Sequence, residues 1–437
     1  MNTSEELLKK IESNQATVGI IGLGYVGLPL ATTFAQAQLK VIGFDKNPDK
    51  VNKINKGNNY ISDILDEEFR EVVNNGKLTA SDDFSRINEC DALIICVPTP
   101  LDIFKKPDMS YIESACIEIG QNMKPGTFIS LESTTYPTTT ENFMLPIIEQ
   151  ESGLKHGTDF WLAYSPERVD PGNDTYKTKN TPKVLGAITE EGLKLGEALY
   201  KKAIQHVHLV SSPRVAEMVK ILENTYRLVN ISLINELALL SGKMDINLWE
   251  VIEAAKTKPF GFQAFYPGPG IGGHCIPLDP FYLEYIAKKF NFDLTMIHTA
   301  GHINMRMPHY MYIKIMSALN KHKKPINGSK VFFLGVAYKP NISDDRESPA
   351  LEIIDTVANK GGIISYNDPY IPSIKTPDGN VFQSTELTAE NLKNADVVVI
   401  TTNHSVYDAS FIMEHSKLIV DLRNVIAPDN NQKVFKL

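Results

Sequence analysis

The feature that most constrains the fold is an apolar run near the N-terminus that ends in a glycine-rich turn. Residues 17–21 are followed by Gly22, Gly24 and Gly27 in the spacing G-x-G-x-x-G, and a helical pattern then runs from 28 to 37. In a dinucleotide-binding turn the first glycine permits the sharp bend and the second lets a pyrophosphate approach the backbone. The third lets the helix pack closely on the strand, with the phosphate at the helix N-terminus.

The next apolar run supports the same interpretation. Residues 41–44 end at Asp45, which lies 21 positions after Gly24. A carboxylate there can bind both ribose hydroxyls and repel a 2′-phosphate. The pattern therefore predicts that NAD rather than NADP is the cofactor.

Strand-like runs alternate with helical patterns at both ends of the chain. The N-terminal runs are 18–21, 41–44, 92–97 and 128–131, and runs at 330–338, 363–368 and 395–402 repeat their spacing. Such alternation predicts parallel sheets covered by helices. The second region lacks G-x-G-x-x-G, so a second NAD is not expected there.

A long helical pattern lies between these regions, from Ser212 as the N-cap through Pro213 to Gly242. It would span roughly 45 Å at 1.5 Å per residue, and we expect it to connect two domains and to offer a dimer surface. We predict an α/β fold with two Rossmann-like doubly wound domains joined by a long central helix. The expected boundaries are 1–211, 212–310 and 311–437.

Composition excludes several classes of protein. The chain has 437 residues and a net charge of −8, which argues against nucleic acid or an anionic membrane as a partner. The first 15 residues do not resemble a signal peptide, and no stretch approaches ~18 uninterrupted apolar residues. The four cysteines show no C-x-x-C pair, so we expect no metal, no disulfide and a cytoplasmic location.

One of those cysteines, Cys275, stands in a segment from Tyr266 to Asp279 that also holds four glycines and three prolines. Such a backbone can present a nucleophilic thiol to a ligand, or it can be a tight structural turn with an incidental cysteine. His274 directly precedes the thiol. Because neighbours in an extended segment point to opposite sides, we expect His274 to be structural or to contact substrate, whereas Asp279 can reach back across a turn.

Other polar residues also have two interpretations. Lys220 and Asn224 are four apart on the predicted long helix, so they either stabilise an oxyanion together or form part of a solvated stripe. Glu167 lies in a loop, where it either activates water or forms a salt bridge with Arg168. After the strand at 330, cations and turn residues at 338–341 and 344–349 indicate a phosphate site or ordinary surface charge.

In their order along the chain these motifs resemble the nucleotide-sugar 6-dehydrogenases, the UDP-glucose and UDP-N-acetylhexosamine dehydrogenases, over essentially the whole sequence. The matches are G-L-G-Y-V-G at 22–27, V-P-T-P at 97–100, E-S-T at 132–134, S-P-E at 165–167, Lys220 with Asn224, G-x-G-G-x-C ending at Cys275, and Lys339 with Arg346. The resemblance implies oxidation of a sugar C6 alcohol to a carboxylate with two NAD. It also implies a homodimer or higher homo-oligomer formed through the central region.

The resemblance also implies roles for individual residues. Cys275 would capture the aldehyde as a thiohemiacetal, whose oxidation gives a thioester. The other catalytic assignments are Lys220 and Asn224 for the oxygen anions, Asp279 and Glu167 for water, and Thr134 as a helper through a water. The residues it assigns to the cofactor are Gly22, Gly24, Tyr25, Val26, Gly27, Asp45, Pro98, Thr99, Thr134 and Arg346. The residues it assigns to the UDP-sugar are Glu167, Arg168, Lys220, Asn224, Tyr266, Gly272, Gly273 and Lys339.

The sequence departs from UDP-glucose dehydrogenases, which usually have a lysine at the position of Leu278 and a second loop glutamate at that of Pro171. Residues 258–262 and 266–283 look most like bacterial UDP-N-acetylglucosamine 6-dehydrogenases. We therefore predict oxidation of UDP-N-acetylglucosamine to its uronic acid, a precursor of surface polysaccharide. The alternatives are UDP-N-acetylmannosamine, UDP-N-acetylgalactosamine or UDP-glucose as substrate, a two-electron hydroxyacid dehydrogenase, and a catalytically silent sensor.

Overall fold

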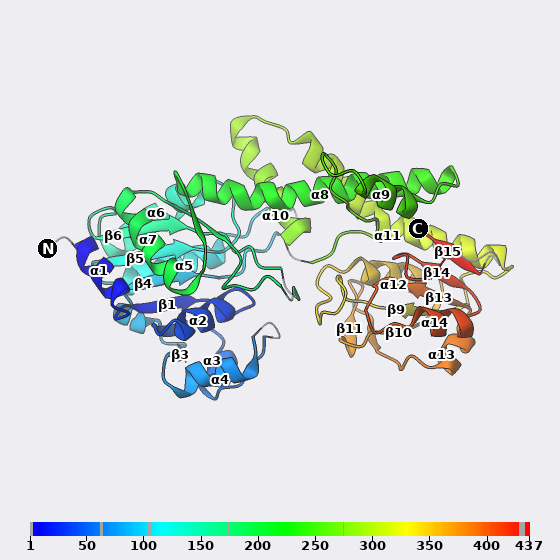
Figure 1. Ribbon diagram of the computed structural model, residues 1–437, viewed down its shortest axis with the longest axis horizontal. Helices are drawn as coiled ribbons and strands as arrows, with labels where there is room; N and C mark the ends of the chain where they lie inside the picture. Colours follow the sequence, from blue (N-terminus) through cyan, green and yellow to red (C-terminus); the bar gives the residue numbers. More distant parts are fainter. Residues whose placement is uncertain are drawn as a thin grey trace. The chain divides into compact units, whose positions relative to one another are not determined.

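The computed structural model describes residues 3–61, 64–102, 106–170, 172–173, 175–273, 275–427 and 433–437. The chain divides into two compact units, Met1–Glu223 with Phe281–Phe292, and Asn224–Pro280 with Asp293–Leu437. Each unit contains a sheet of mainly parallel strands, and helix α8 (Pro213–Lys243) joins them (Figure 1). The predicted α/β class is confirmed. The predicted division into three domains at 211 and 310 stays a prediction.

The sheet of the first unit has the strand order β3-β2-β1-β4-β5-β6-β7-β8. Its strands are β1 (Thr17–Ile21), β2 (Lys40–Phe44), β3 (Leu78–Ser81), β4 (Ala92–Ile95), β5 (Thr127–Leu131), β6 (Phe160–Tyr164), β7 (Lys183–Ala187) and β8 (Val207–Val210). All neighbours are parallel except β6 and β7, which are antiparallel. The four strands predicted from the sequence correspond to β1, β2, β4 and β5.

Helices cover both faces of this sheet. They are α1 (Thr3–Glu12), α2 (Gly27–Gln36), α3 (Pro48–Asn55), α4 (Asp66–Asn74), α5 (Ser110–Asn122), α6 (Leu145–Ser152) and α7 (Glu190–Ala203), with a 3₁₀ turn at Phe84–Glu89 and a π turn at Thr140–Met144. Local caps explain several starts: Asn47 accepts from the N–H of Asp49 at the start of α3, and Thr189 accepts from that of Gly192 at the start of α7.

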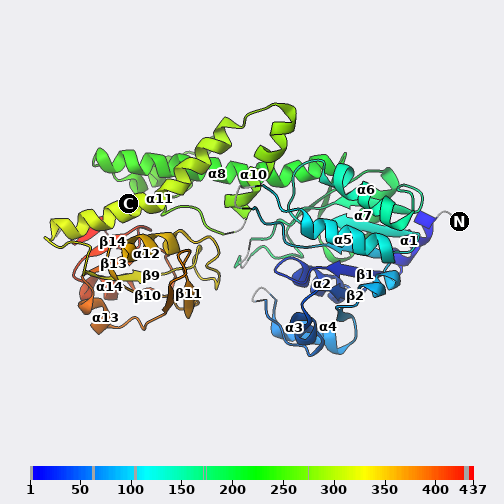
Figure 2. The same cartoon turned by 180° about the vertical axis from the view of Figure 1, so that it is seen from behind.

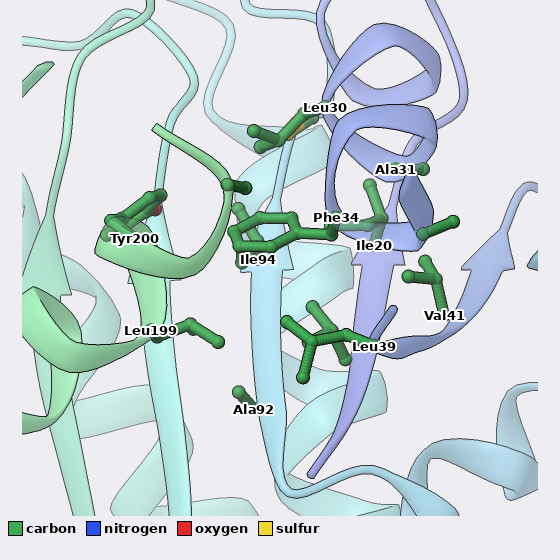
Figure 3. Close-up of a cluster of buried hydrophobic side chains, with 14 of the residues drawn as sticks. Ile20, Leu30, Ala31, Phe34, Leu39, Val41, Ala92, Ile94, Leu199 and Tyr200 are labelled. Atoms are coloured by element: carbon green, nitrogen blue, oxygen red, sulfur yellow. The ribbon is translucent and has the colours of Figure 1, made fainter. Parts of the chain in front are cut away.

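Strands buried on both faces need apolar residues at successive positions, and β1 and β4 are such strands. On one face Ile20 and Ile94 lie in a core with α1, α2 and α7, whereas the neighbouring Ile21 and Ile95 lie in a second core with α5 and α6. Figure 3 shows the first core, where the rings of Phe34 and Tyr200 meet with centroids 6.0 Å apart.

The second unit has an entirely parallel sheet in the order β10-β9-β13-β14-β15. Its strands are β9 (Lys330–Leu334), β10 (Ile363–Asn367), β13 (Val397–Ile400), β14 (Ile419–Asp421) and β15 (Val434–Lys436), and a separate hairpin joins β11 (Ser373–Lys375) to β12 (Val381–Gln383). Helices α11 (Thr295–Lys321) and α12 (Pro349–Asn359) share one core with the sheet, and α13 (Ala389–Asn394) and α14 (Ala409–His415) share the other (Figure 2). The predicted repeat of the N-terminal pattern therefore corresponds to β9, β10 and β13.

Asp368 follows β10 at the position that Asp45 holds after β2. Its carboxylate accepts from the backbone N–H groups of Val336, Ala337, Tyr370 and Ile371. It also lies 3.0 Å from Nε2 of His404, and both side chains are fully buried. The carboxylate is thus satisfied by the protein itself.

Helix α8 begins and ends close to the predicted positions. Ser212 Oγ accepts from the N–H of Val215 at 3.4 Å, Pro213 is the first helical residue, and the helix ends one residue after Gly242. Its 31 residues span roughly 46 Å at 1.5 Å per residue.

Two further helices lie in the described part of the chain, α9 (Leu248–Lys256) and α10 (Cys275–Ala287), and a 3₁₀ turn follows at Lys288–Phe290. The sequence argument took the backbone around His274 and Cys275 as extended, and this is wrong for Cys275, which begins α10. Pro277 fits the first helical turn because the backbone N–H that it lacks would have no partner there. His274 and Pro171 lie outside the described residues. Over the part of the chain that the structure describes, none of the helices has the length and apolarity needed to cross a bilayer.

Candidate active site

The three glycines of the N-terminal turn differ in what surrounds them. Gly22 has φ 94°, and a Cβ there would lie 2.6 Å from the carbonyl oxygen of Cys96. A Cβ at Gly27 would lie 1.8 Å from the carbonyl oxygen of Gly22, whereas one at Gly24 would meet no protein atom within 4 Å. The first and third glycines are therefore required by the turn and by helix packing, and the second leaves room for a ligand, as a dinucleotide-binding turn demands.

Asp45 follows β2 and holds this turn in place. Its carboxylate accepts from the N–H groups of Leu23 at 3.1 Å and Asn47 at 3.0 Å, and Nζ of Lys50 lies 2.9 Å away. The sequence analysis did not predict this contact of Lys50, although a lysine in the first turn of the helix after Asp45 could have indicated it. It competes for the carboxylate that the ribose hydroxyls are predicted to bind. Tyr25 is half exposed beside the same turn.

The loops after β4 and β5 meet at the carboxyl edge of the sheet, where ligands of such folds bind. Oγ of Ser133 donates to the carbonyl of Val97 at 2.8 Å. Thr99 is buried, and its carbonyl accepts from the hydroxyl of Tyr282. Pro98 is exposed and Thr134 is half-buried. The predicted cofactor residues Pro98, Thr99 and Thr134 thus lie in two joined loops.

Behind these loops lies a buried ion pair that sequence reasoning missed. Nζ of Lys183, the first residue of β7, lies 2.5 Å from Oε2 of Glu132, and the lysine side chain is only 5% exposed. The hydroxyl of Tyr200 donates to Oε1 of Glu132 at 2.6 Å. Burial raises the pKa of Glu132 to about 7, even though the lysine and the hydroxyl oppose the shift. Nothing in the sequence distinguishes Lys183 from an exposed lysine at the start of a strand.

Glu167 adjoins this pair. Its Oε1 accepts from the N–H groups of Arg168 and Val169, each at 2.7 Å, and its Oε2 lies 3.6 Å from Nζ of Lys183. Nζ of Lys220 donates to its backbone carbonyl at 2.7 Å. Burial raises the pKa of Glu167, but Lys183, the two N–H groups and Lys220 outweigh burial and hold it below its usual range. The side chain is therefore an ionised carboxylate.

Arg168 does not pair with Glu167. Its guanidinium contacts both carboxylate oxygens of Glu223 at 3.2 and 2.5 Å, and it donates to the carbonyl of Pro182 at 2.6 Å. The simple loop salt bridge considered for Glu167 and Arg168 is therefore wrong. The predicted substrate residues Glu167, Arg168 and Lys220 do come together.

In the second unit Asn224 and Asp279 form a buried pair. Nδ2 of Asn224 donates to Oδ2 of Asp279 at 2.5 Å, and both side chains are almost fully buried. Asp279 lies on α10 one turn after Cys275. Lys220 and Asn224 lie one turn apart on α8, as predicted, and neither belongs to a solvated stripe. The predicted nucleophilic role of Cys275 stays a prediction.

The glycines before Cys275 pack against the segment after β9. Gly273 has φ 82°, and its N–H donates to the carbonyl of Arg346 at 3.0 Å. A Cβ at Gly272 would lie 2.6 Å from Cβ of Tyr338, which directly precedes the half-buried Lys339. The guanidinium of Arg346 pairs with the carboxylate of Asp344 at 2.7 Å.

Tyr266 is separate from that group. Its hydroxyl donates to Glu253 at 2.7 Å, and its ring stacks on Trp249 of α9. The segment with Gly272 and Gly273 thus contacts the segment that contains Lys339 and Arg346. Tyr266 instead contacts helix α9.

Comparison with known proteins decides the family. Residues 16–204 match the NAD binding domain of the UDP-glucose/GDP-mannose dehydrogenase family, residues 214–306 match its central domain, and residues 332–428 match its UDP binding domain. The chain belongs to this family. It is accordingly a member of a family of NAD-dependent nucleotide-sugar dehydrogenases, with NAD as its cofactor and a UDP binding domain.

Relatives of this dehydrogenase align over nearly their whole length. The UDP-N-acetyl-D-mannosamine dehydrogenase of Pyrococcus horikoshii is 36% identical, over 94% of this chain and 96% of its own. The UDP-N-acetyl-D-glucosamine 6-dehydrogenase of Pseudomonas aeruginosa is 32% identical, over 92% of this chain and 98% of its own. The solved structure of UDP-D-ManNAc dehydrogenase from Pyrococcus horikoshii matches with a TM-score of 0.88 at 34% identity, covering 96% of this chain and 98% of that one.

Proposed function

We propose that this dehydrogenase oxidises C6 of a UDP-N-acetylhexosamine from the alcohol to the carboxylate, with two NAD consumed for each sugar. The observation that carries the proposal is the 2.5 Å hydrogen bond from Asn224 of α8 to Asp279 of α10, the helix that begins at Cys275 one turn earlier. It fixes a buried carboxylate four residues after a thiol, which a simple two-electron alcohol dehydrogenase does not need.

The chemistry is divided among the chain's own groups. The cofactor, when bound, accepts a hydride in each of the two oxidations. We assign the thiol of Cys275 to capture of the aldehyde, so that the thiohemiacetal and then the thioester remain attached to the protein. Lys220 and Asn224 carry donors that stabilise the oxygen anions of these steps.

Water finally attacks the thioester, breaks the C–S bond, and releases the carboxylate and the free thiol. Glu167 is our candidate base for this step because its carboxylate is ionised and fixed by two backbone N–H groups. Asp279 orients the water or assists its deprotonation. For each sugar the reaction consumes two NAD and one water and yields two NADH and three protons, counting the proton of the acid.

The identity of the sugar is part of the proposal. Our sequence prediction is UDP-N-acetylglucosamine, whereas two relatives that are 36% identical carry the name UDP-N-acetyl-D-mannosamine dehydrogenase. Both epimers therefore enter the test as primary substrates, with UDP-N-acetylgalactosamine and UDP-glucose beside them.

We also propose a homodimer formed through α8. Within the second unit its large apolar side chains Tyr226, Leu233, Leu237 and Leu240 are 37–52% exposed. Their spacing of seven, four and three residues places them along one stripe of the helix. A second copy of the chain is the occupant we expect for this stripe.

The experiment is the NADH yield at completion from limiting UDP-sugar with excess NAD, run for all four sugars. Two equivalents from an N-acetylhexosamine support the proposal and identify the epimer. One equivalent would favour a two-electron dehydrogenase, and none would favour a sensor. Cys275→Ser should abolish uronate formation, whereas the control Cys116→Ala, a buried cysteine of α5, should retain it.

A further inference from the structure

Lys183 is placed where lysines are rarely found. It opens strand β7 with its side chain 5% exposed, and its backbone N–H donates to the carbonyl of His206 at 2.9 Å. Charged lysines are almost never fully buried unless they are paired, because removal of the ammonium from water is costly. The arrangement around this one must therefore compensate its charge.

Two carboxylates share that ammonium. Oε2 of Glu132 lies at 2.5 Å and Oε2 of Glu167 at 3.6 Å, on loops that follow β5 and β6. The hydroxyl of Tyr200 donates to the other oxygen of Glu132, so the neighbouring hydroxyl of Ser130, 3.0 Å away, must donate to the phenol oxygen. Every oxygen of Glu132 is thus fixed from the sheet or from α7.

Glu167 is fixed in a different way. Two backbone N–H groups hold its Oε1, and its Oε2 faces Lys183, the only side-chain cation within 4 Å among the residues that the structure describes. The charged and titratable groups around it are Lys183 on β7, Glu132 after β5, Lys220 on α8 and the buried thiol of Cys96 after β4. Among these, Lys183 is the one whose position is set by a second carboxylate.

We propose that Lys183 is a positioning residue for Glu167: its ammonium, anchored by Glu132, keeps the Glu167 carboxylate ionised and oriented as the base of the acid-forming step. This inference rests on the proposed function, in which Glu167 has that role. Lys183 itself touches no reacting atom. Glu132 acts on Glu167 only through Lys183, by holding the ammonium in place.

The arrangement predicts a different outcome for each of two variants. Lys183→Met removes the cation that faces Glu167, so the pKa of Glu167 rises. Glu132 has a pKa of about 7 and is already neutral at the lower pH where Glu167 titrates, so Glu132→Gln should leave the pKa of Glu167 near that of the parent. A role of Lys183 in folding alone would lower stability in Lys183→Met without moving the pKa of Glu167.

The first experiment measures kcat for uronate formation against pH. On the low-pH side of this profile, the acid limb, protonation of Glu167 slows the reaction. The acid limb should move up by about one pH unit in Lys183→Met, which is about a tenfold loss of rate on the acid side, and should stay in place in Glu132→Gln. Lys183→Arg should restore the limb, because the cation is retained. The control is Lys201→Met, which removes a lysine of α7 that pairs with the partly exposed Glu197, and its profile should match the parent. An acid limb that does not move in Lys183→Met would overturn the inference.

The second experiment does not depend on catalysis. Urea unfolding of the parent, Lys183→Met, Glu167→Gln and the double variant gives a coupling between the two side chains. We expect a favourable coupling of about tenfold in the unfolding equilibrium constant at pH 8, lost on acidification as Glu167 is protonated. If Lys183→Met does not fold, the double change Glu132→Gln with Lys183→Met replaces it, because it leaves no unpaired charge at this pair.

The two experiments separate two kinds of failure. A parent protein that yields no uronate, together with a coupling at pH 8, would refute the proposed function and retain the contact between Lys183 and Glu167 as an electrostatic one. Uronate formation by the parent without such a coupling would refute the inference alone.

Discussion

Two glycines of the N-terminal turn should respond in opposite ways to an added methyl group. In Gly27→Ala the new Cβ would lie 1.8 Å from the carbonyl oxygen of Gly22, far below the 3.0 Å at which neighbouring atoms must move. Overpacking of this kind costs roughly 1–3 kcal/mol, and the better helix propensity of alanine returns up to about 1 kcal/mol. Since the blocking atom belongs to the backbone of a tight turn, we expect a net destabilisation of about 2 kcal/mol.

Gly24→Ala should leave the fold intact and weaken NAD binding. A Cβ there meets no protein atom within 4 Å, and the lower backbone entropy of the unfolded alanine chain can add about 0.4–1 kcal/mol of stability. The same methyl would occupy the space where the pyrophosphate should approach the backbone. We expect at least a tenfold loss of NAD affinity, which is about 1.4 kcal/mol.

The chain's two tryptophans allow the first unit to be followed by itself. Trp161 on β6 is 1% exposed, and the other tryptophan, Trp249, belongs to the second unit. In a Trp249→Phe background, urea unfolding followed by Trp161 fluorescence reports the first unit, and calorimetric titration reports NAD binding. Gly24→Ala with unchanged NAD affinity would refute the pyrophosphate assignment. Gly27→Ala with an unchanged unfolding midpoint would refute the packing argument.

Three other predictions concern stability, catalysis and assembly. Burial raises the pKa of Asp91, but a hydrogen bond from the N–H of Thr17 and two lysines outweigh burial and hold this pKa below its usual range. Asp91→Asn should therefore lower the free energy of unfolding by about 1–3 kcal/mol at pH 7, and the difference in this free energy between variant and parent, measured by urea unfolding, should disappear as the pH falls below about 4. Asn224→Ala leaves Asp279 without its 2.5 Å donor and should lower kcat by about 10²–10³ with an unchanged circular dichroism spectrum. Leu237→Glu places a charge on the exposed stripe of α8 and should convert the proposed dimer to monomer in sedimentation velocity, whereas an unchanged sedimentation coefficient would contradict the proposed interface.

Local patterns predicted much of the fold because the forces that set them are local. The runs at β1, β2, β4 and β5 are apolar because strands of a parallel sheet are buried on both faces. The strands β6 to β8 were not predicted, and the antiparallel pairing of β6 with β7 is invisible to periodicity, since strand direction depends on the path of the connecting chain.

The candidate site was predicted less completely, for a related reason. Lys220 and Asn224 were placed on one helix face because their spacing of four residues determines it. The partner of Arg168 is 55 residues away, as Glu223, and the cation that faces Glu167 is Lys183 on another strand. Long-range ion pairs of this kind depend on the tertiary fold, so no regular spacing in the sequence predicts them. The start of a helix at Cys275 was not predicted, because the glycines and prolines around this residue were taken as evidence of a turn over the whole segment.

The buried pair of Asp368 and His404 shows that an aspartate at the same position of a repeated strand pattern can have a different environment in each unit. After β2, Asp45 lies beside a turn with open space at Gly24. After β10, both carboxylate oxygens of Asp368 are bound by backbone N–H groups, four in all, and one of them also contacts an imidazole. The carboxylate of Asp368 therefore stabilises the fold of the second unit from within. To engineer a second dinucleotide site in the second unit, one would therefore have to remove the groups that bind Asp368 rather than introduce a new aspartate.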